Sequence, residues 1–161
     1  MRRVVSLAIV VGLLVVAALM SVGTSLATAP SPGVAAPFTY RATVVPNHFD
    51  SNDYKIFQKN PEDIVMRELT IPAGGNSGWH SHPGVTYVIL TQGTLTNYHA
   101  NDPTCTGTVI NAGESYIEPP GDVHNVRNEG TTTAVLFVTF LDVPVGGAFR
   151  TDAPRPAQCP F

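Results

Sequence analysis

Apolar residues in this chain form one long continuous run near its start and many short runs after it. The continuous run covers residues 4–22 and is interrupted only by glycine and serine. The later runs are rich in β-branched and aromatic residues and are separated by proline, glycine, asparagine or aspartate. Because none of them shows a sustained helical period, they predict short β-strands. We expect these strands at residues 41–45, 54–58, 64–71, 79–82, 85–92, 94–99, 106–110, 115–118, 123–127 and 133–141.

Many short strands at regular spacing are typical of an all-β protein. The strand pattern alone does not decide between an immunoglobulin-like sandwich and a jelly-roll barrel. Gly93 and Gly113 fit tight turns between strands, and Gly121 is expected to adopt a positive φ before the strand that follows it. The hydrophobic pattern therefore predicts the all-β class and leaves the architecture to more specific motifs.

The N-terminus has the three parts of a secretory signal. Arg2 and Arg3 precede the long apolar run, and the small residues Ser25 and Ala27 follow it. This order predicts a signal peptide over residues 1–27 that is cleaved after Ala27. The alternative is an uncleaved anchor, because the run approaches the about 20 residues that span a membrane. In both cases we expect the rest of the chain outside the cytoplasm, either secreted or in the cell envelope.

The chain after the signal reads as a linker followed by one domain. Residues 28–37 are rich in proline, alanine and glycine, which predicts a flexible linker. Residues 38–161 are long enough for a single domain with its own apolar core. Removing the signal leaves 7 basic against 12 acidic residues, a net charge of −5. This charge argues against a nucleic-acid partner, and we expect membrane contact only through the N-terminal signal.

Three histidines are placed where one cation could bind all of them. His80 and His82 are two residues apart, so they project from the same face of an extended strand. His124 follows a Pro-Pro-Gly turn that directs a later strand back into the fold. Three imidazoles from two strand segments predict a metal site.

The spacing around these histidines is more specific than their number. Residues 74–93 read G-x5-H-x-H-x3-T-x6-G, and residues 113–128 read G-x5-P-x-G-x2-H-x3-N. This pair of stretches resembles the two motifs that define the cupins, and the resemblance covers roughly residues 54–142. It implies a double-stranded β-helix, the jelly-roll barrel of that family, which holds a divalent metal inside its mouth.

One position departs from the cupin pattern. The family has a glutamate where this chain has Thr86, and in metal-binding cupins that glutamate is usually the fourth ligand. The resemblance therefore implies a site made of His80, His82 and His124, with Thr86 in contact with a water or substrate at the fourth position. Iron, manganese, zinc, nickel and copper all bind imidazole, so the ligands do not select one metal.

Other polar residues near the motifs have two interpretations each. Tyr116 and Glu118 share one strand face, and Glu118 is either a solvated rim residue or an inward carboxylate that serves as a general base or as a replacement ligand. We favour the rim, because most glutamates are exposed. His99 and His48 lie outside the motifs and are expected at the surface. Trp79 lies on the opposite face from the histidines and is expected to seal the outside of the barrel.

The two cysteines predict a disulfide. The chain contains an even number of cysteines, Cys105 and Cys159, and it carries a predicted export signal. Neither cysteine has the spacing of a redox or zinc motif. A bond between them would hold the C-terminal tail, residues 151–161, against the loop near residues 101–106. The alternative is a pair of free thiols, which an oxidising compartment disfavours.

Two functions from different classes fit these observations. The first is a metal-dependent enzyme, such as a dioxygenase, that acts on a small organic molecule. The second is a non-catalytic barrel that binds a metal or a small ligand. The cupin fold hosts both, so the resemblance does not select the reaction, and the sequence identifies no catalytic residue. Single-domain cupins commonly form homodimers, so the expected partners are a small-molecule ligand and a second copy of the chain.

Overall fold

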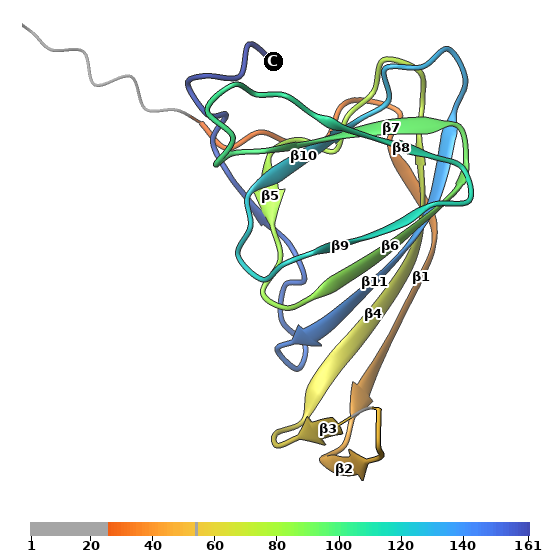
Figure 1. Cartoon of the computed structure of the whole chain (residues 1–161), viewed down its shortest axis with the longest axis vertical. Helices are drawn as coiled ribbons and strands as arrows, with labels where there is room; N and C mark the ends of the chain where they lie inside the picture. The colour runs from red at the N-terminus through yellow and green to blue at the C-terminus, as the bar shows by residue number, and fades with distance from the viewer. Residues whose placement is uncertain (1–25, 54) are drawn as a thin grey trace, which may run out of the picture.

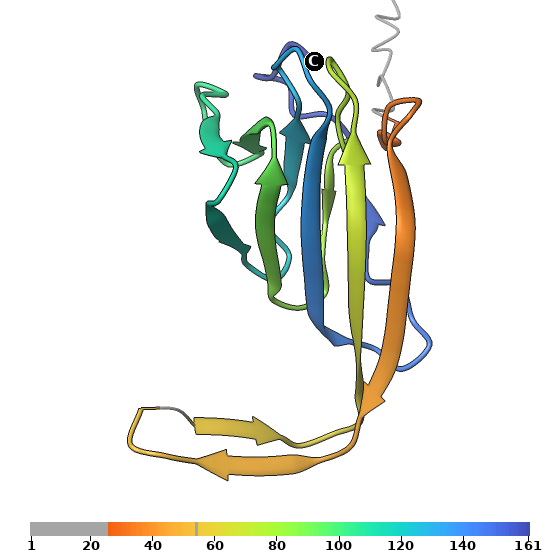
Figure 2. The same cartoon turned by 90° about the vertical axis from the view of Figure 1, so that its right-hand side faces the viewer.

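Two five-stranded antiparallel sheets face each other in the computed structural model, which describes residues 26–53 and 55–161 (Figure 1). The first sheet has the order β1-β4-β11-β6-β9, with β1 at Ala35–Val44, β4 at Glu62–Ile71, β11 at Ala134–Val143, β6 at Thr86–Gln92 and β9 at Ser115–Glu118. The second has the order β12-β5-β10-β7-β8, with β12 at Thr151–Asp152, β5 at His80–Ser81, β10 at His124–Arg127, β7 at Thr94–His99 and β8 at Thr108–Asn111. A separate hairpin pairs β2 (Asn47–Asp50) with β3 (Lys55–Gln58), and Figure 2 shows it reaching away from the main sheet.

Most strands that follow one another along the chain lie in opposite sheets. From β4 to β11 the chain changes sheet at every step except between β7 and β8, which form a hairpin. The part of the chain that the structure describes contains no helix. This connectivity is that of a double-stranded β-helix, so the prediction of an all-β jelly-roll barrel is confirmed.

Every predicted strand corresponds to an observed one, and the differences lie at the edges. β2 and β12 were not predicted, because one has no hydrophobic alternation and the other has only two residues. β1 begins at Ala35, ahead of the predicted start, and its pairing with β4 is irregular between Ala35 and Phe38. Proline at position 37 is tolerated there because β1 is an edge strand. Gly121 has a φ of 73°, as expected.

The N-terminal segment is attached to the domain, which corrects the prediction of a flexible linker over residues 28–37. The Thr28 backbone N–H donates to Ala153 O (3.0 Å), and the Thr28 hydroxyl accepts from the Trp79 N–H (2.6 Å). A side chain at Gly78 would collide with the Thr28 carbonyl, so glycine permits this close approach. The partners come from distant parts of the chain, which is why local composition did not reveal them.

The predicted signal peptide stays a prediction, because residues 1–25 lie outside the described residues. Ala27, the last residue before the expected cleavage point, forms an isolated β-bridge with Pro154. Within the described residues, no helix is long and apolar enough to cross a membrane.

The apolar core lies between the two sheets and shares its strand faces with the polar site. Inward-facing residues alternate along the strands, as on β11, where Leu136, Val138 and Phe140 are buried. On β6 the inward residue Val88 belongs to this core, whereas Thr86, two positions earlier, is a buried polar residue. The same alternation that builds the core therefore turns the polar side chains inward.

The outward face of the first sheet carries several exposed apolar residues. Each of them is at least 45% exposed, and they are Phe38, Tyr40, Met66, Tyr87, Ile89, Ile117 and Phe137. A contiguous apolar surface of this kind is typical of an interaction site. The homodimer stays a prediction, and this face offers apolar area for it.

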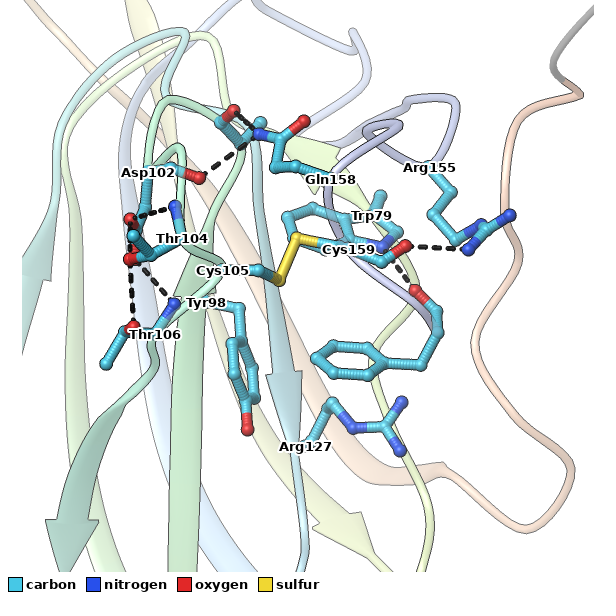
Figure 3. Close-up of a disulfide and its surroundings, with 12 residues drawn as sticks. Trp79, Tyr98, Asp102, Thr104, Cys105, Thr106, Arg127, Arg155, Gln158 and Cys159 are labelled. Carbon is cyan, nitrogen blue, oxygen red and sulfur yellow. Dashed lines mark hydrogen bonds between the residues drawn. A yellow bond between two sulfur atoms is a disulfide. The ribbon is translucent and has the colours of Figure 1, made fainter.

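A disulfide joins Cys105 to Cys159, as the cysteine count predicts, and holds the C-terminal tail over the second sheet (Figure 3). Trp79 is buried beneath this tail, and its indole N–H donates to the carbonyl oxygen of Phe161 (3.2 Å). The Arg127 guanidinium lies 4.0 Å from the centre of the Phe161 ring. Trp79 therefore seals the outside of the barrel, and the tail covers it.

Acid is expected to weaken the fold through Asp63, which connects three segments. Its carboxylate accepts hydrogen bonds from Thr43 (2.7 Å), Arg41 (2.6 Å) and the Gly146 backbone N–H (2.9 Å). The Thr43 and Gly146 hydrogen bonds, followed by Arg41, lower the pKa of Asp63 below its ordinary value. Because the folded-state pKa is depressed, this stabilisation is complete above the unfolded pKa of about 4 and is lost as the pH falls towards the folded value.

The measurement is urea unfolding between pH 6 and pH 3 of wild type and of Asp63→Asn. The variant is expected to be less stable at pH 6 and to lose less stability on acidification. Asp53→Asn, an exposed aspartate between β2 and β3, serves as the control. Equal acid dependence in wild type and Asp63→Asn would show that other carboxyl groups dominate.

Candidate metal centre

Neighbouring strands of the second sheet bring the three histidines together. β5 and β10 pair with His80 opposite His124, so these two side chains project from one face of the sheet, and His82 joins them two residues after His80. The ring centres lie 4.4 to 5.3 Å apart. One nitrogen from each ring lies within 4.8 Å of the others, and all three residues are buried. The predicted cluster of His80, His82 and His124 is therefore present.

Backbone carbonyls orient each imidazole. Nδ1 of His80 lies 2.8 Å from Gly78 O, Nδ1 of His82 lies 2.7 Å from Phe149 O, and Nδ1 of His124 lies 3.0 Å from Asp122 O. A carbonyl oxygen only accepts, so each Nδ1 carries the proton and donates it. A neutral ring then has its lone pair on Nε2, the usual state of a histidine that binds a metal.

Glu118 is buried among the histidines, which corrects the favoured interpretation of a solvated rim residue. It is 3% exposed. One carboxylate oxygen lies 3.3 Å from His82 Nε2 and the other lies 3.1 Å from His124 Nε2. The inward alternative is therefore the right one, and a negative charge lies beside the histidine nitrogens.

Thr86 and Glu118 are direct partners across two neighbouring strands. The antiparallel register of β6 and β9 places them opposite each other, where Cβ atoms lie about 4.5–5.5 Å apart. Thr86 is fully buried, and its hydroxyl has no hydrogen-bond partner among the described residues. The carboxylate that the cupin pattern has at position 86 is thus absent from β6 but present on the adjacent strand.

The electrostatics of His80 and Glu118 favour the protonation states that bind a cation. Burial is the main cause that lowers the pKa of His80 to about 2, and His124 and Arg150 add to it. Burial alone would raise the pKa of Glu118, but His124 and His82 outweigh it and hold that pKa well below its ordinary value. Neutral His80 and ionised Glu118 are both forms that act as metal ligands.

His124 has an unusual environment. Burial lowers its pKa, but the Glu118 carboxylate more than compensates, so the pKa of His124 is raised. Its Nε2 has no hydrogen-bond partner within the described part of the chain, because the Glu118 oxygen lies at a suitable distance but in an unsuitable direction. A buried nitrogen without a partner that faces a carboxylate indicates a position for an ion. The donor set therefore fits a divalent transition metal.

A cavity of about 160 Å³ adjoins His80, His82 and Glu118. Most of its wall is apolar and comes from the core strands, and Tyr116, Arg67 and Arg150 add polar groups. Tyr116 shares the inward face of β9 with Glu118, as predicted. The motifs did not indicate Arg67, Phe149 or Arg150, because Arg67 lies on β4 and the other two lie in the loop before β12, outside both motifs.

The two remaining histidines lie outside the cluster. His99 pairs with Asp122 at 2.6 Å, and its ring centre lies 6.4 Å from that of His124. It is only partly exposed, near the edge of the site, whereas the sequence predicts it at the surface. His48 lies on β2, in the hairpin that extends away from the barrel.

Comparison with known proteins agrees with the motifs and the geometry. The cupin domain family model matches residues 67–140, a region that contains all three histidines and Glu118. Residues 67–140 of this chain form a cupin domain. Within this cupin, β1 and the loop and tail after β11 lie outside the matched region.

Curated relatives are longer proteins. A germin-like protein, subfamily T member 3, of Arabidopsis thaliana is 33% identical over 85 residues, which cover 52% of this chain and 37% of that protein. Auxin-binding protein ABP19b of Prunus persica is 33% identical over 79 residues, which cover 48% of this chain and 38% of that protein. The cupin thus matches well under half the length of these relatives.

Solved structures include similar barrels. A protein with a double-stranded β-helix domain from Klebsiella pneumoniae is 21% identical, with a TM-score of 0.49 over 78% of this chain and 90% of that one. A cupin-like protein from Thermotoga maritima is 20% identical, with a TM-score of 0.47 over 56% of this chain and 65% of that one. An oxalate oxidase is 27% identical, with a TM-score of 0.42 over 47% of this chain and 40% of that one.

Proposed function

We propose that this cupin binds one divalent transition metal through His80, His82, His124 and Glu118, and that it is a metal-dependent enzyme for a small organic molecule held in the adjoining cavity. The observation that carries the metal site is the orientation of the imidazoles. Three Nδ1–H groups are engaged by backbone carbonyls, which leaves the three Nε2 atoms free to bind a metal, and two of them, on His82 and His124, lie 3.3 and 3.1 Å from one buried carboxylate. An apolar core would not need three imidazoles oriented in this way. The polar groups buried in such a core are hydrogen-bonded within the protein.

The carboxylate changes the charge that a metal would have in this site. Three neutral imidazoles leave the full charge of a divalent ion, whereas Glu118 neutralises half of it. Mixed imidazole and carboxylate ligands suit iron, manganese, zinc, nickel and copper, so the metal stays one of these five. A bound ion of this kind supplies Lewis acidity or redox chemistry at its open coordination positions.

The protein groups around the site have separate tasks. Phe140 and Phe149 pack against the His82 side of the cavity and exclude water from it. Burial, followed by the Glu118 charge, raises the pKa of Tyr116 well above its ordinary value, so its phenol stays protonated and acts as a hydrogen-bond or proton donor. Glu118, committed to the metal, leaves the role of general base to a group on the substrate or to a bound water.

The second candidate function is non-catalytic binding of a small ligand. It is favoured by the apolar wall of the cavity and by relatives that carry the name auxin-binding protein. Turnover of a bound small molecule by the metal-loaded protein, followed by product analysis, separates the enzyme from the binding barrel. The disulfide and the predicted N-terminal signal support a location outside the cytoplasm for either function.

Metal binding tests the proposed ligand set. The protein, purified without chelator, is expected to contain about one equivalent of a transition metal by elemental analysis. Glu118→Gln is expected to weaken metal affinity by about two orders of magnitude or more, because breaking a buried charge pair costs about 3–5 kcal/mol and each about 1.4 kcal/mol is tenfold in affinity. Competition with a chelating dye measures the difference.

Moving the carboxylate across the strands is the matched control. Thr86→Glu added to Glu118→Gln returns a carboxylate to the position that the cupin pattern uses, so it is expected to recover most of the lost affinity. Glu114→Gln makes the same chemical change at an exposed glutamate and is expected to leave affinity unchanged. Wild-type affinity in Glu118→Gln would mean that this carboxylate is not a ligand, and absence of metal from every preparation would refute the metal site.

A further inference from the structure

Two arginines line the same cavity as the histidines. Arg67 projects from β4, and Arg150 lies in the loop just before β12. Arg150 is already compensated, since its Nε lies 2.6 Å from Asp152 and its Nη2 donates to the Ser77 carbonyl (2.8 Å). Arg67 forms no ion pair with any described residue, and its Nε donates only to the Thr39 hydroxyl (3.2 Å). The cavity therefore contains one positive charge that no protein carboxylate balances.

The position of Arg67 is defined by a row of aromatic rings. Its guanidinium carbon lies 5.1 Å from the centre of the Phe149 ring, which lies 4.8 Å from that of Phe140. The Phe140 ring in turn lies 4.8 Å from that of His82. Arg67 and the metal centre are thus at the two ends of a short aromatic wall.

Arg67 is half-buried in the same cavity as a second positive charge, that of Arg150. Burial, followed by the charge of Arg150, lowers the pKa of Arg67. Two half-buried guanidinium groups gain most from an anion with planar, paired oxygens, because their N–H groups match a carboxylate in a bidentate contact. Tyr116 lines the same cavity, and its hydroxyl is a further donor.

The size and lining of the cavity define the rest of the ligand. Its volume of about 160 Å³ is close to the engineered apolar cavity of about 150 Å³ that accommodates benzene. Leu69, Leu136, Val138 and the two phenylalanines also line the cavity. A ligand that fills it has an apolar body of about one ring or a short branched chain.

We propose that this cupin binds small organic monocarboxylates, with the carboxylate held by Arg67 at the far end of the cavity and the apolar body directed along Phe149 and Phe140 towards the metal centre. This inference rests on the proposed function, because it names the substrate class of the same site. The anion site itself consists of protein groups only. Its binding can therefore be measured with and without metal.

Calorimetric titration with benzoate tests the charge preference, using the processed chain both zinc-loaded and metal-free. Benzyl alcohol and benzylamine are the neutral and cationic probes of similar size. Benzoate is expected to bind saturably, benzyl alcohol at least about tenfold more weakly, and benzylamine not at all, because a charge-assisted hydrogen bond is worth a tenfold change or more. Equal affinity for benzoate and benzyl alcohol, or no binding of benzoate, would overturn the proposal.

Variants assign the anion site to Arg67. Arg67→Gln is expected to weaken benzoate binding at least about tenfold and to leave benzyl alcohol binding and zinc content unchanged. Arg67→Lys keeps the charge without the bidentate geometry, so its benzoate affinity is expected to lie between those of wild type and Arg67→Gln. Arg155→Gln removes an exposed arginine whose Nη1 bonds the Cys159 carbonyl (2.6 Å), and it is the matched control.

The outcomes separate this inference from the proposed metal site. Wild-type benzoate affinity in Arg67→Gln, lost when zinc is removed, would mean that the metal binds the carboxylate and would overturn the inference while leaving the metal site intact. A charge preference that depends on Arg67 in a protein that takes up no metal would support the inference and refute the metal site.

Discussion

The double variant His80→Ala, His124→Ala is expected to lose metal binding completely, together with all stabilisation by metal. It removes two of the four proposed ligands from the two strands, β5 and β10, whose pairing forms the site. A ligand that binds only the folded state stabilises it by about 2.7 kcal/mol at a hundredfold excess over its Kd. Wild type is expected to show a gain of this size in urea unfolding with metal, and the double variant none.

The control for this experiment is His99→Ala. His99 is the histidine nearest to the cluster, with its ring centre 6.4 Å from that of His124, and its Nδ1 is paired with Asp122. It is expected to keep one equivalent of metal and the full stabilisation. A double variant that still gains stability from the metal would place the binding site elsewhere on the chain.

A loss of stability in the metal-free double variant is also expected. Glu118 would lose His124, one of the two histidines beside its buried charge, and keep His82. An uncompensated buried charge is destabilising. Adding Glu118→Gln to the double variant removes this charge and is expected to recover part of the metal-free stability without restoring metal binding. This triple variant separates loss of the ligands from loss of the fold.

Loss of the disulfide is expected to destabilise the protein by about 4 kcal/mol, since the chain-entropy model gives this value for a closed loop of about 55 residues. The bond joins Cys105 to Cys159 across 54 positions of the chain. A domain has only about 5–15 kcal/mol of total stability, so the loss is a large part of it. Urea unfolding of the Cys105→Ala, Cys159→Ala variant measures the change.

Trp79 reports whether this loss is local or global. It is the only tryptophan in the chain and lies beneath the tail that the disulfide holds. Detachment of the tail alone is expected to shift its fluorescence to longer wavelength before the barrel unfolds. A reducing agent should reproduce the effect in wild type and change nothing in the double alanine variant. A variant as stable as wild type would show that packing around Trp79 holds the tail without the disulfide.

Short-range patterns in the sequence were enough for much of the fold. The segment 94–99 was predicted as a strand and is β7 in full, and 115–118 is β9, because residues that alternate between a core and a solvent face have a period of two. The segment 28–37 was predicted as a flexible linker, and it is hydrogen-bonded to the domain instead. Its partners at Asn76 and Ala153 are remote in the chain, and no local pattern identifies remote partners.

The candidate site also has a part that the sequence determined and a part that it did not. The sequence alone determined that His80 and His82 share one face, because residues i and i+2 of a strand share a face, and its motifs indicated His124 as the third ligand. Only the tertiary structure decided that Glu118 lies opposite Thr86 and beside the histidines, since this depends on β6 and β9 being neighbours in register. The same holds for Arg67 and Arg150, which reach one cavity from β4 and from the loop before β12. Composition and spacing depend only on the order of residues along the chain. Which charges meet in a cavity depends on which strands are neighbours and on where the loops bring the chain back, and both are properties of the folded protein.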